Sequence, residues 1–299
     1  FTVKGINISS PAAGVTWAHG QTHDVEWQAA AAGLTMNLYY SDDDGATYAS
    51  RPINPSPLSI ASGVFPWTLA STLLPSDGEA RLKAVSDTGV AGVSQAFTVR
   101  GLRVVRPSSL NIWAAGDIER VRWKAMPAGG AYTLRVSSFD VGSGSWIEQE
   151  EHVGVGTAEA GPGYYYFDWG VVDFDPARDP DRVRIEVEDA VNGLAGTSDE
   201  VQVFAGASVY VISPAGGDVW TVQSARQIVW TTAGTTETSF LVDYSDDPSF
   251  TTSTPLNYPY AQDPGTTVFR MDWVIPDTIG PAWYVRVRNP AETLIHVSE

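Results

Sequence analysis

The sequence contains one tryptophan frame three times. In this frame a proline is followed six residues later by a tryptophan, and ten residues after that by a second tryptophan: Pro11-Trp17-Trp27, Pro107-Trp113-Trp123 and Pro214-Trp220-Trp230. A third tryptophan follows each copy, at Trp67, Trp169 and Trp273, so nine of the eleven tryptophans occupy repeat positions. A period of about a hundred residues is the length of one small domain. The frame therefore predicts tandem copies of one domain with these tryptophans in their cores.

Alternating apolar and polar residues form short runs between clusters of Gly, Pro, Asp and Ser. This pattern is typical of antiparallel β-sandwiches, and about seven strands fit in each copy. In the first copy we expect strands near residues 5–10, 22–28, 34–41, 46–51, 63–69, 80–86 and 93–99. Helix should be almost absent. The predicted fold class is all-β, with three tandem antiparallel β-sandwich domains at residues 5–100, 101–206 and 207–299.

The composition excludes several classes of function. The chain has no cysteine, which rules out disulfides and thiolate chemistry, and its 18 basic against 35 acidic residues give a net charge of −17. An acidic surface repels DNA and anionic membranes, so we expect no nucleic-acid partner. No run of 18 apolar residues occurs, so we expect no membrane insertion. No G-x-S-x-G, H-E-x-x-H or phosphate-binding glycine motif is present, and we expect no enzymatic activity.

The third copy carries the clearest family pattern. It reads Ile212-Ser213-Pro214-Ala215-Gly216-Gly217-Asp218-Val219-Trp220, then Ile228-Val229-Trp230 and Met271-Asp272-Trp273-Val274-Ile275-Pro276. These residues resemble the immunoglobulin-like or fibronectin-III-like repeats of exported bacterial and fungal cell-surface proteins. The second copy departs from the pattern, with Leu110 and Asn111 where the paired glycines stand. The resemblance implies a non-catalytic, Ig-like module of a larger extracellular or cell-surface protein, and it fixes neither ligand nor partner.

Residues Ser41-Asp42-Asp43-Asp44-Gly45-Ala46-Thr47-Tyr48 resemble the aspartate-box hairpin. In that hairpin an aspartate caps backbone N–H groups of the turn and the glycine supplies the positive φ, so its role is structural. Ser138–Gly142 and Ser245–Pro248 look like eroded copies at the equivalent turn.

Three groups of residues are candidates for binding. A calcium site is possible at the clustered loop carboxylates Asp173, Asp175, Asp179 and Asp181, with ordinary solvated loops as the alternative and no other cofactor expected. Tyr164 and Tyr166 face away from Trp169, and they could stack on a sugar or fill an interface, as could Trp146 and Trp283, which lie outside the repeat frame. His19 and His23 are expected to be exposed turn residues.

The first residues of the chain duplicate a later segment. Phe1-Thr2-Val3-Lys4-Gly5 closely matches Phe97-Thr98-Val99-Arg100-Gly101, the last strand of the first domain running into the second. Residues 1–4 are therefore expected to be the terminal strand of a preceding or neighbouring domain, and the third domain is expected to stop before its own last strand. Either the chain is a segment of a longer repeat array, or Phe1, Thr2 and Val3 complete the third domain of a neighbouring subunit as a donor strand.

These observations favour a non-enzymatic extracellular or cell-surface structural protein, such as a subunit of a fibre, filament or stalk, whose partners are further copies of itself or adjacent repeat domains. The alternative is an adhesin or a carbohydrate-binding accessory module of a secreted multidomain protein, whose partner would be a cell-surface polysaccharide. Aromatic side chains exposed in a groove would favour binding, and aromatic side chains buried between domains or subunits would favour structure.

Overall fold

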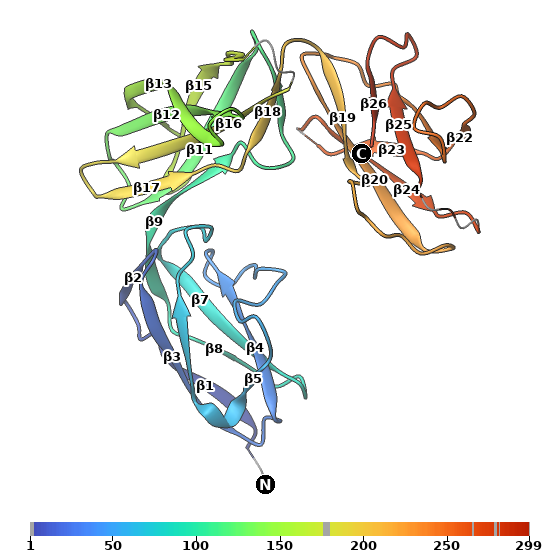
Figure 1. Ribbon diagram of the computed structural model, residues 1–299. Helices are drawn as coiled ribbons and strands as arrows, with labels where there is room; N and C mark the ends of the chain where they lie inside the picture. The colour runs from blue at the N-terminus through green and yellow to red at the C-terminus, as the bar shows by residue number, and fades with distance from the viewer. Residues whose placement is uncertain (1–2, 176–179, 265, 278–279, 281, 299) are drawn as a thin grey trace.

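The computed structural model describes residues 3–175, 180–264, 266–277, 280 and 282–298. It contains three Ig-like β-sandwiches, which we call domains 1, 2 and 3 in chain order. Domain 1 lies end to end with domain 2, and domain 3 lies beside domain 2, with the N-terminal region at the far end of domain 1 (Figure 1). The only helical element in the described residues is one 3-10 turn, η1 (Ile60–Ser62), so the predicted all-β class is confirmed.

Domain 1 pairs a three-stranded sheet with a larger one. The three-stranded sheet has the order β1-β3-β6, and the larger sheet runs β5-β4-β7-β9, with β8 added to β7 and the short β2 parallel to β9. The strands are β1 (Gly5–Ser10), β2 (Thr16–Ala18), β3 (Thr22–Ala30), β4 (Thr35–Ser41), β5 (Leu58–Ser59), β6 (Val64–Thr68), β7 (Ser76–Ser86), β8 (Ala91–Val93) and β9 (Phe97–Arg106).

Domain 2 repeats this plan and takes its first strand from β9. One sheet runs β9-β11-β15-β14 and the other β10-β18-β16-β12-β13, with β17 on β16. Its strands are β10 (Ile112–Ala114), β11 (Ile118–Met126), β12 (Tyr132–Asp140), β13 (Ser145–Val155), β14 (Thr157–Ala158), β15 (Tyr164–Gly170), β16 (Asp181–Asp189), β17 (Leu194–Thr197) and β18 (Val201–Phe204).

Domain 3 has two four-stranded sheets in the described residues, β19-β20-β24-β23 and β22-β21-β25-β26. Its strands are β19 (Ser208–Ser213), β20 (Ala225–Ala233), β21 (Leu241–Ser245), β22 (Thr254–Leu256), β23 (Tyr260–Gln262), β24 (Val268–Val274), β25 (Tyr284–Arg288) and β26 (Ile295–Val297). Unlike domains 1 and 2, its described part has no strand in the place of β9 or β18.

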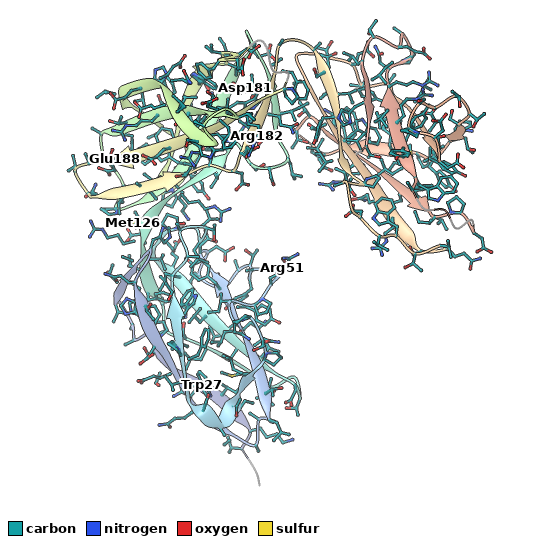
Figure 2. All side chains as sticks on the ribbon, in the orientation of Figure 1. Trp27, Arg51, Met126, Asp181, Arg182 and Glu188 are labelled. Carbon is teal, nitrogen blue, oxygen red and sulfur yellow. The ribbon has the colours of Figure 1, made fainter. Side chains whose placement is uncertain are left out.

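The repeat tryptophans lie in the cores, as the frame predicts. Eight of the nine are buried, including Trp27, which points between the strands of domain 1 in Figure 2. The exception is Trp220, which is only half-buried in domain 3. Burying a side chain of this size removes roughly 150–250 Å² from water, which explains how domains without disulfides acquire substantial cores.

One predicted strand of domain 1 is absent. Residues 46–51 form a loop. The reason is that the side chain of Asn54, and not a neighbouring strand, accepts the hydrogen bond from the Leu38 N–H of β4. The buried amide of Asn54 accepts a hydrogen bond from Leu38 N at 2.8 Å, and its nitrogen donates to Asn37 and to the Ser56 carbonyl. The short β5 then takes the edge position beside β4.

Candidate functional site

A single strand, β9, joins domains 1 and 2. Its first half pairs with β7, where Phe97 lies opposite Ala80, and its second half pairs with β11, where Leu102 lies opposite Ala125. Phe97 and Val99 belong to the core of domain 1, and Leu102 belongs to the core of domain 2. The two domains consequently share one nine-stranded sheet, visible in Figure 1 as the strand that passes from the lower sandwich into the upper one.

A histidine packs on the middle of β9. A Cβ atom added to Gly101 would lie 2.2 Å from His19 Nδ1, so the imidazole rests directly on the glycine backbone. His19, Gly101 and Leu194 line a cavity of about 230 Å³ between the domains. Burial lowers the pKa of His19, and the nearby Arg103 lowers it further. The expectation that His19 and His23 are exposed is wrong, because His19 belongs to this junction and His23 stacks on Trp17 with ring centroids 4.6 Å apart.

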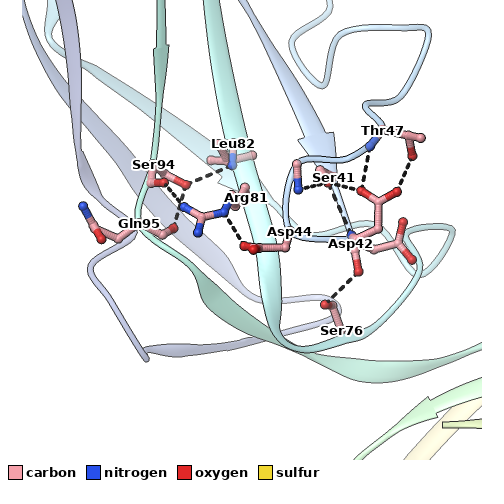
Figure 3. A network of polar contacts seen from close by, with 11 residues as sticks. Ser41, Asp42, Asp44, Thr47, Ser76, Arg81, Leu82, Ser94 and Gln95 are labelled. Atoms are coloured by element: carbon pink, nitrogen blue, oxygen red, sulfur yellow. Dashed lines mark hydrogen bonds and ion pairs between the residues drawn. The ribbon is translucent and has the colours of Figure 1, made fainter. Parts of the chain in front are cut away.

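The aspartate-box turn of domain 1 also contacts domain 2. Within the turn, Asp43 accepts hydrogen bonds from the Thr47 amide at 2.9 Å and the Thr47 hydroxyl at 2.6 Å, while Gly45 has φ +84° (Figure 3). A hydrogen bond from the Ser41 hydroxyl, together with these two from Thr47, lowers the pKa of Asp43 to about 2. The adjacent Asp42 binds Lys124 of β11 at 3.0 Å, and Lys124 is only 8% exposed. The structural role predicted for the turn thus extends to orienting the next domain.

The eroded copies of this turn keep the same chemistry. Asp140 accepts from the amides of Gly142 and Ser143, and Asp247 accepts from those of Ser249 and Thr251. Hydrogen bonds from the side chains of Ser143 and Thr251, together with these amide bonds, lower the pKa of Asp140 and of Asp247, respectively.

Domains 2 and 3 meet differently. Strand β18 ends at Phe204 and β19 begins at Ser208, so no strand is shared. A small apolar cluster of Ile112, Ala114, Phe204 and Ala233 closes this junction, with Tyr210 packed against it.

Domain 3 has an open aromatic groove of about 720 Å³. Its floor contains Trp220, Trp273 and Tyr244, and Trp283, which is 37% exposed, stands at its side. The rings of Trp220 and Trp273 are 6.1 Å apart and nearly perpendicular, and Tyr244 lies 5.2 Å from Trp273 and 5.5 Å from Trp283. Among the described residues that line the groove, Asp218 is the only charged one, so the recognition chemistry of this lining is that of an apolar segment or of a stacked ring.

The other aromatic candidates are covered by cations. Arg120 lies 3.8 Å above the ring of Tyr166, and Arg122 lies 4.2 Å from the ring of Tyr164. Trp146 packs against Phe139 at 5.4 Å and lies beneath Arg184. Sequence alternation correctly directs Trp169 inward and this tyrosine pair outward, but it gives no sign of the arginine layer that β11 places on them.

The three acidic candidates that the structure describes, Asp173, Asp175 and Asp181, do not converge on one metal-binding group. Asp181 is fully buried on β16, whereas Asp173 lies in a loop and accepts a hydrogen bond from the Asp175 amide at 3.2 Å. Asp179 lies outside the described residues. Within the part of the chain that the structure describes, no three His, Cys, Asp or Glu residues converge as a metal-binding group. No helix in that part is long and apolar enough to cross a membrane.

Of the predicted donor strand, Phe1 and Thr2 lie outside the described residues. Val3 is described and its side chain is 68% exposed.

Comparisons with known proteins identify similar folds but no family. No family model matches the chain, and no curated protein sequence does. Among solved structures, fibronectin(III)-like modules of Clostridium thermocellum CbhA are similar at 15% identity and a TM-score of 0.20, over 67% of this chain and 93% of that one. The complex of Dpr2 Ig1-Ig2 with DIP-Theta Ig1-Ig3 is similar at 7% identity and a TM-score of 0.22, over 99% and 98%. The assignment to Ig-like sandwiches rests on the strand order above.

Proposed function

We propose that this chain is a non-enzymatic extracellular structural protein, a stiff segment of a surface fibre, filament or stalk. The observation that carries the proposal is β9. A flexible linker would let domains 1 and 2 rotate freely, whereas a strand hydrogen-bonded to β7 on one side of the junction and to β11 on the other holds them at a fixed angle.

Side-chain contacts reinforce this junction. The Asp42–Lys124 ion pair joins the two domains away from β9, and Arg100 donates to the Asn192 carbonyl. Contacts at separate points around one strand resist bending in more than one direction. Such stiffness is of little use to a diffusing single-domain binder, and it suits a protein that holds a distance or transmits a load.

The neighbouring carboxylate and imidazole of Glu150 and His152 contact the core of domain 2. Glu150 accepts a hydrogen bond from the indole of Trp169 at 2.9 Å and lies 3.0 Å from His152 Nε2. Because the indole N–H of a core tryptophan is its partner, this carboxylate fixes a structural ring. We therefore propose no catalytic role for it.

Small-angle X-ray scattering tests the stiffness directly. A two-domain fragment of residues 5–206 should fit one rigid arrangement, and inserting Gly-Ser-Gly-Ser after Arg100 should broaden its distance distribution. The same insertion after Gly206 in the full chain is the matched control at the unshared junction. If the fragment already fits only a broad ensemble, the structural proposal fails.

The second candidate function is an adhesin or carbohydrate-binding accessory module. The observation that favours it is Trp283, which is partly exposed beside a groove floored by two more tryptophans. Aromatic faces of this kind stack on sugar rings. Binding of soluble polysaccharides that is lost in Trp283→Ala, but not in Trp146→Ala, would support this candidate.

A further inference from the structure

We propose that protonation of His19 loosens the junction between domains 1 and 2, so that the stiffness of the chain depends on pH. The inference rests on the structural function proposed above and adds a regulator to it. His19 lies on the shared strand β9 at the point where this strand leaves domain 1 and enters domain 2.

The short strand β2 supports β9 at this boundary (Figure 1). It runs parallel to β9, and its last residue, Ala18, lies opposite Arg100. The His19 amide adds a hydrogen bond to the Arg100 carbonyl at 3.0 Å. The next residue of β9, Gly101, already pairs with Met126 of domain 2. His19 therefore fixes β9 where the two sandwiches meet.

The ring of His19 is packed as a neutral group. It rests on the backbone of Gly101, because a Cβ atom added there would lie 2.2 Å from Nδ1 and 2.4 Å from Cε1. Both ring nitrogens are buried, and neither has a hydrogen-bond partner among the described residues. Burying a charge without a partner is costly, so a proton on this ring destabilises the closed junction.

The charged groups around the ring increase this cost. Burial is the main cause that lowers the pKa of His19; the Leu73 backbone opposes it, and the guanidinium of Arg103 lowers the pKa further. A second cation, Arg100, lines the pocket beside the ring, and the described residues of that lining include no carboxylate. Asp189, in the adjoining β16–β17 hairpin, accepts hydrogen bonds from amides of its own turn. A protonated His19 would therefore lie beside two arginines.

The pocket beside the ring gives the protonated side chain room to move. It has a volume of about 230 Å³ and lies between the turn of domain 1 that carries His19 and residues 193–195 of domain 2. Rotation of the imidazole away from Gly101 into this space would let water reach the charge and would remove the ring from β9. The strand itself stays continuous and the Asp42–Lys124 ion pair remains, so the domains bend about β9 without separating.

Acid should shift the junction toward this open state. When the junction is open, His19 is solvated and has its ordinary pKa of 6.5, which is higher than its pKa in the closed junction. The open state therefore binds the proton more tightly, and the fraction of closed junctions decreases as the pH falls below about 6.5. Between pH 7.5 and pH 5 the ratio of open to closed junctions should rise several-fold, with an upper limit of about 30-fold for a closed state that takes up no proton.

Amide hydrogen exchange of the full chain, resolved by NMR, tests this shift. The His19 amide is protected by its hydrogen bond to Arg100 only while the junction is closed. After correction for the intrinsic exchange rate, its protection factor should be several-fold lower at pH 5 than at pH 7.5. The Trp27 amide, which donates to the Gly63 carbonyl in domain 1, is the internal control and should change less than twofold. Equal protection of the His19 amide at both pH values would overturn the proposal.

Three variants show whether His19 is the group that titrates. His19→Phe keeps an aromatic ring that cannot be protonated, and His19→Gln replaces the ring with a neutral amide. In both, protection of the amide of residue 19 should be the same at the two pH values. His23→Gln is the matched control in the same turn and should keep the pH dependence of the parent. The proposal is overturned if either His19 variant retains that dependence or if His23→Gln abolishes it.

The parent chain provides a measurement that needs no variant. The Cε1–H resonance of His19 should titrate below pH 6.5, and an ordinary pKa would overturn the proposal.

Spin-label distances separate failure of this inference from failure of the stiff-segment function. The chain has no cysteine, so Leu34→Cys and Val141→Cys place one label on an exposed position of each domain. A broad distance distribution at pH 7.5 would overturn the stiff-segment function and the inference with it. If the distribution is narrow at pH 7.5 and protection at residue 19 does not change with pH, only the inference is lost.

Discussion

Domains 1 and 3 share the tryptophan frame, but their aromatic cores are covered to different extents. In domain 1 Phe97 and Val99 of β9 cover the pair Trp17 and Trp67, whereas in domain 3 the equivalent pair, Trp220 and Trp273, lines an open groove. The closing strand of domain 1 is at the same time the first strand of domain 2. In domain 1 the last side of the core is built by a strand that domain 2 shares, and the described part of domain 3 has no strand in that place.

The largest expected contrast lies at the first tryptophan of the frame. Trp17 is 6% exposed and Trp220 is half-buried in the open groove. Trp17→Ala should destabilise domain 1 by about 3–5 kcal/mol, because it leaves a cavity in a closed core. Trp220→Ala removes a ring that water already reaches, and should cost roughly half as much or less. Hydrogen exchange resolved by domain measures each loss separately. Equal losses would mean that the groove is not open in solution.

Gly101 and Gly5 form the second contrast. Gly101→Val would push a side chain into His19 and should cost about 1–3 kcal/mol, while Gly5→Val meets open space and should be nearly neutral. Chemical denaturation of the two variants measures both. Adding His19→Ala to Gly101→Val should recover part of the loss, since it makes room for the valine. A Gly101→Val chain as stable as the parent would show that His19 does not rest on this glycine.

Asp42 and Asp246 form the third contrast, because they are equivalent turn residues with different surroundings. Asp42 binds the nearly buried Lys124, whereas Asp246 is exposed. Asp42→Asn should cost about 1 kcal/mol, as expected for a partly buried ion pair, and Asp246→Asn should cost little. Thermal melts at low and high salt would measure the effects. A double-mutant cycle of Asp42→Asn with Lys124→Met should show non-additivity, and additive losses would contradict a direct pair.

At the aspartate-box turn, domains 1 and 3 should show the same pH dependence. The change in the free energy of unfolding should be the smallest of the four predicted changes. Hydrogen bonds depress the pKa of Asp43 to about 2 and also lower that of Asp247. A carboxyl whose pKa is depressed on folding stabilises the fold above its unfolded pKa of roughly 4, and this contribution disappears as the pH falls toward the folded pKa. For Asp43 the loss should therefore occur between about pH 4 and pH 2. Carboxyl NMR titrations should show both shifts, and an ordinary pKa at either residue would contradict the turn geometry.

The tryptophan frame predicts the fold well, because large aromatic residues at fixed spacing report the core directly. Eight of the nine frame tryptophans are buried, and alternation correctly separates Trp169 from Tyr164 and Tyr166. The prediction of a strand at residues 46–51 is wrong, because the side chain of Asn54 accepts the hydrogen bond from the Leu38 N–H of β4 that this strand would have accepted. Asn54 is a polar residue outside any periodic pattern, so the sequence gives no sign of this contact.

The contacts between domains could not be predicted in this way. His19 packs on Gly101, and Lys124 binds Asp42, 82 residues earlier in the chain. These pairs depend on the angle between two sandwiches, which no local pattern encodes. The match between residues 1–5 and 97–101 stays a prediction, because Phe1 and Thr2 lie outside the described residues.

The sharing of β9 also constrains how the chain can fold as it leaves the ribosome. Domain 1 cannot complete its core until Phe97 and Val99 have emerged, and the next residues of the same strand must then wait for β11, which ends at Met126. During that interval half of β9 is paired and half presents a bare edge, at synthesis rates of about 5–20 residues per second. Neighbouring repeats with similar edges are prone to exchange strands at this stage. The shared strand β9 that stiffens the folded protein therefore also makes folding depend on the order in which domains 1 and 2 leave the ribosome.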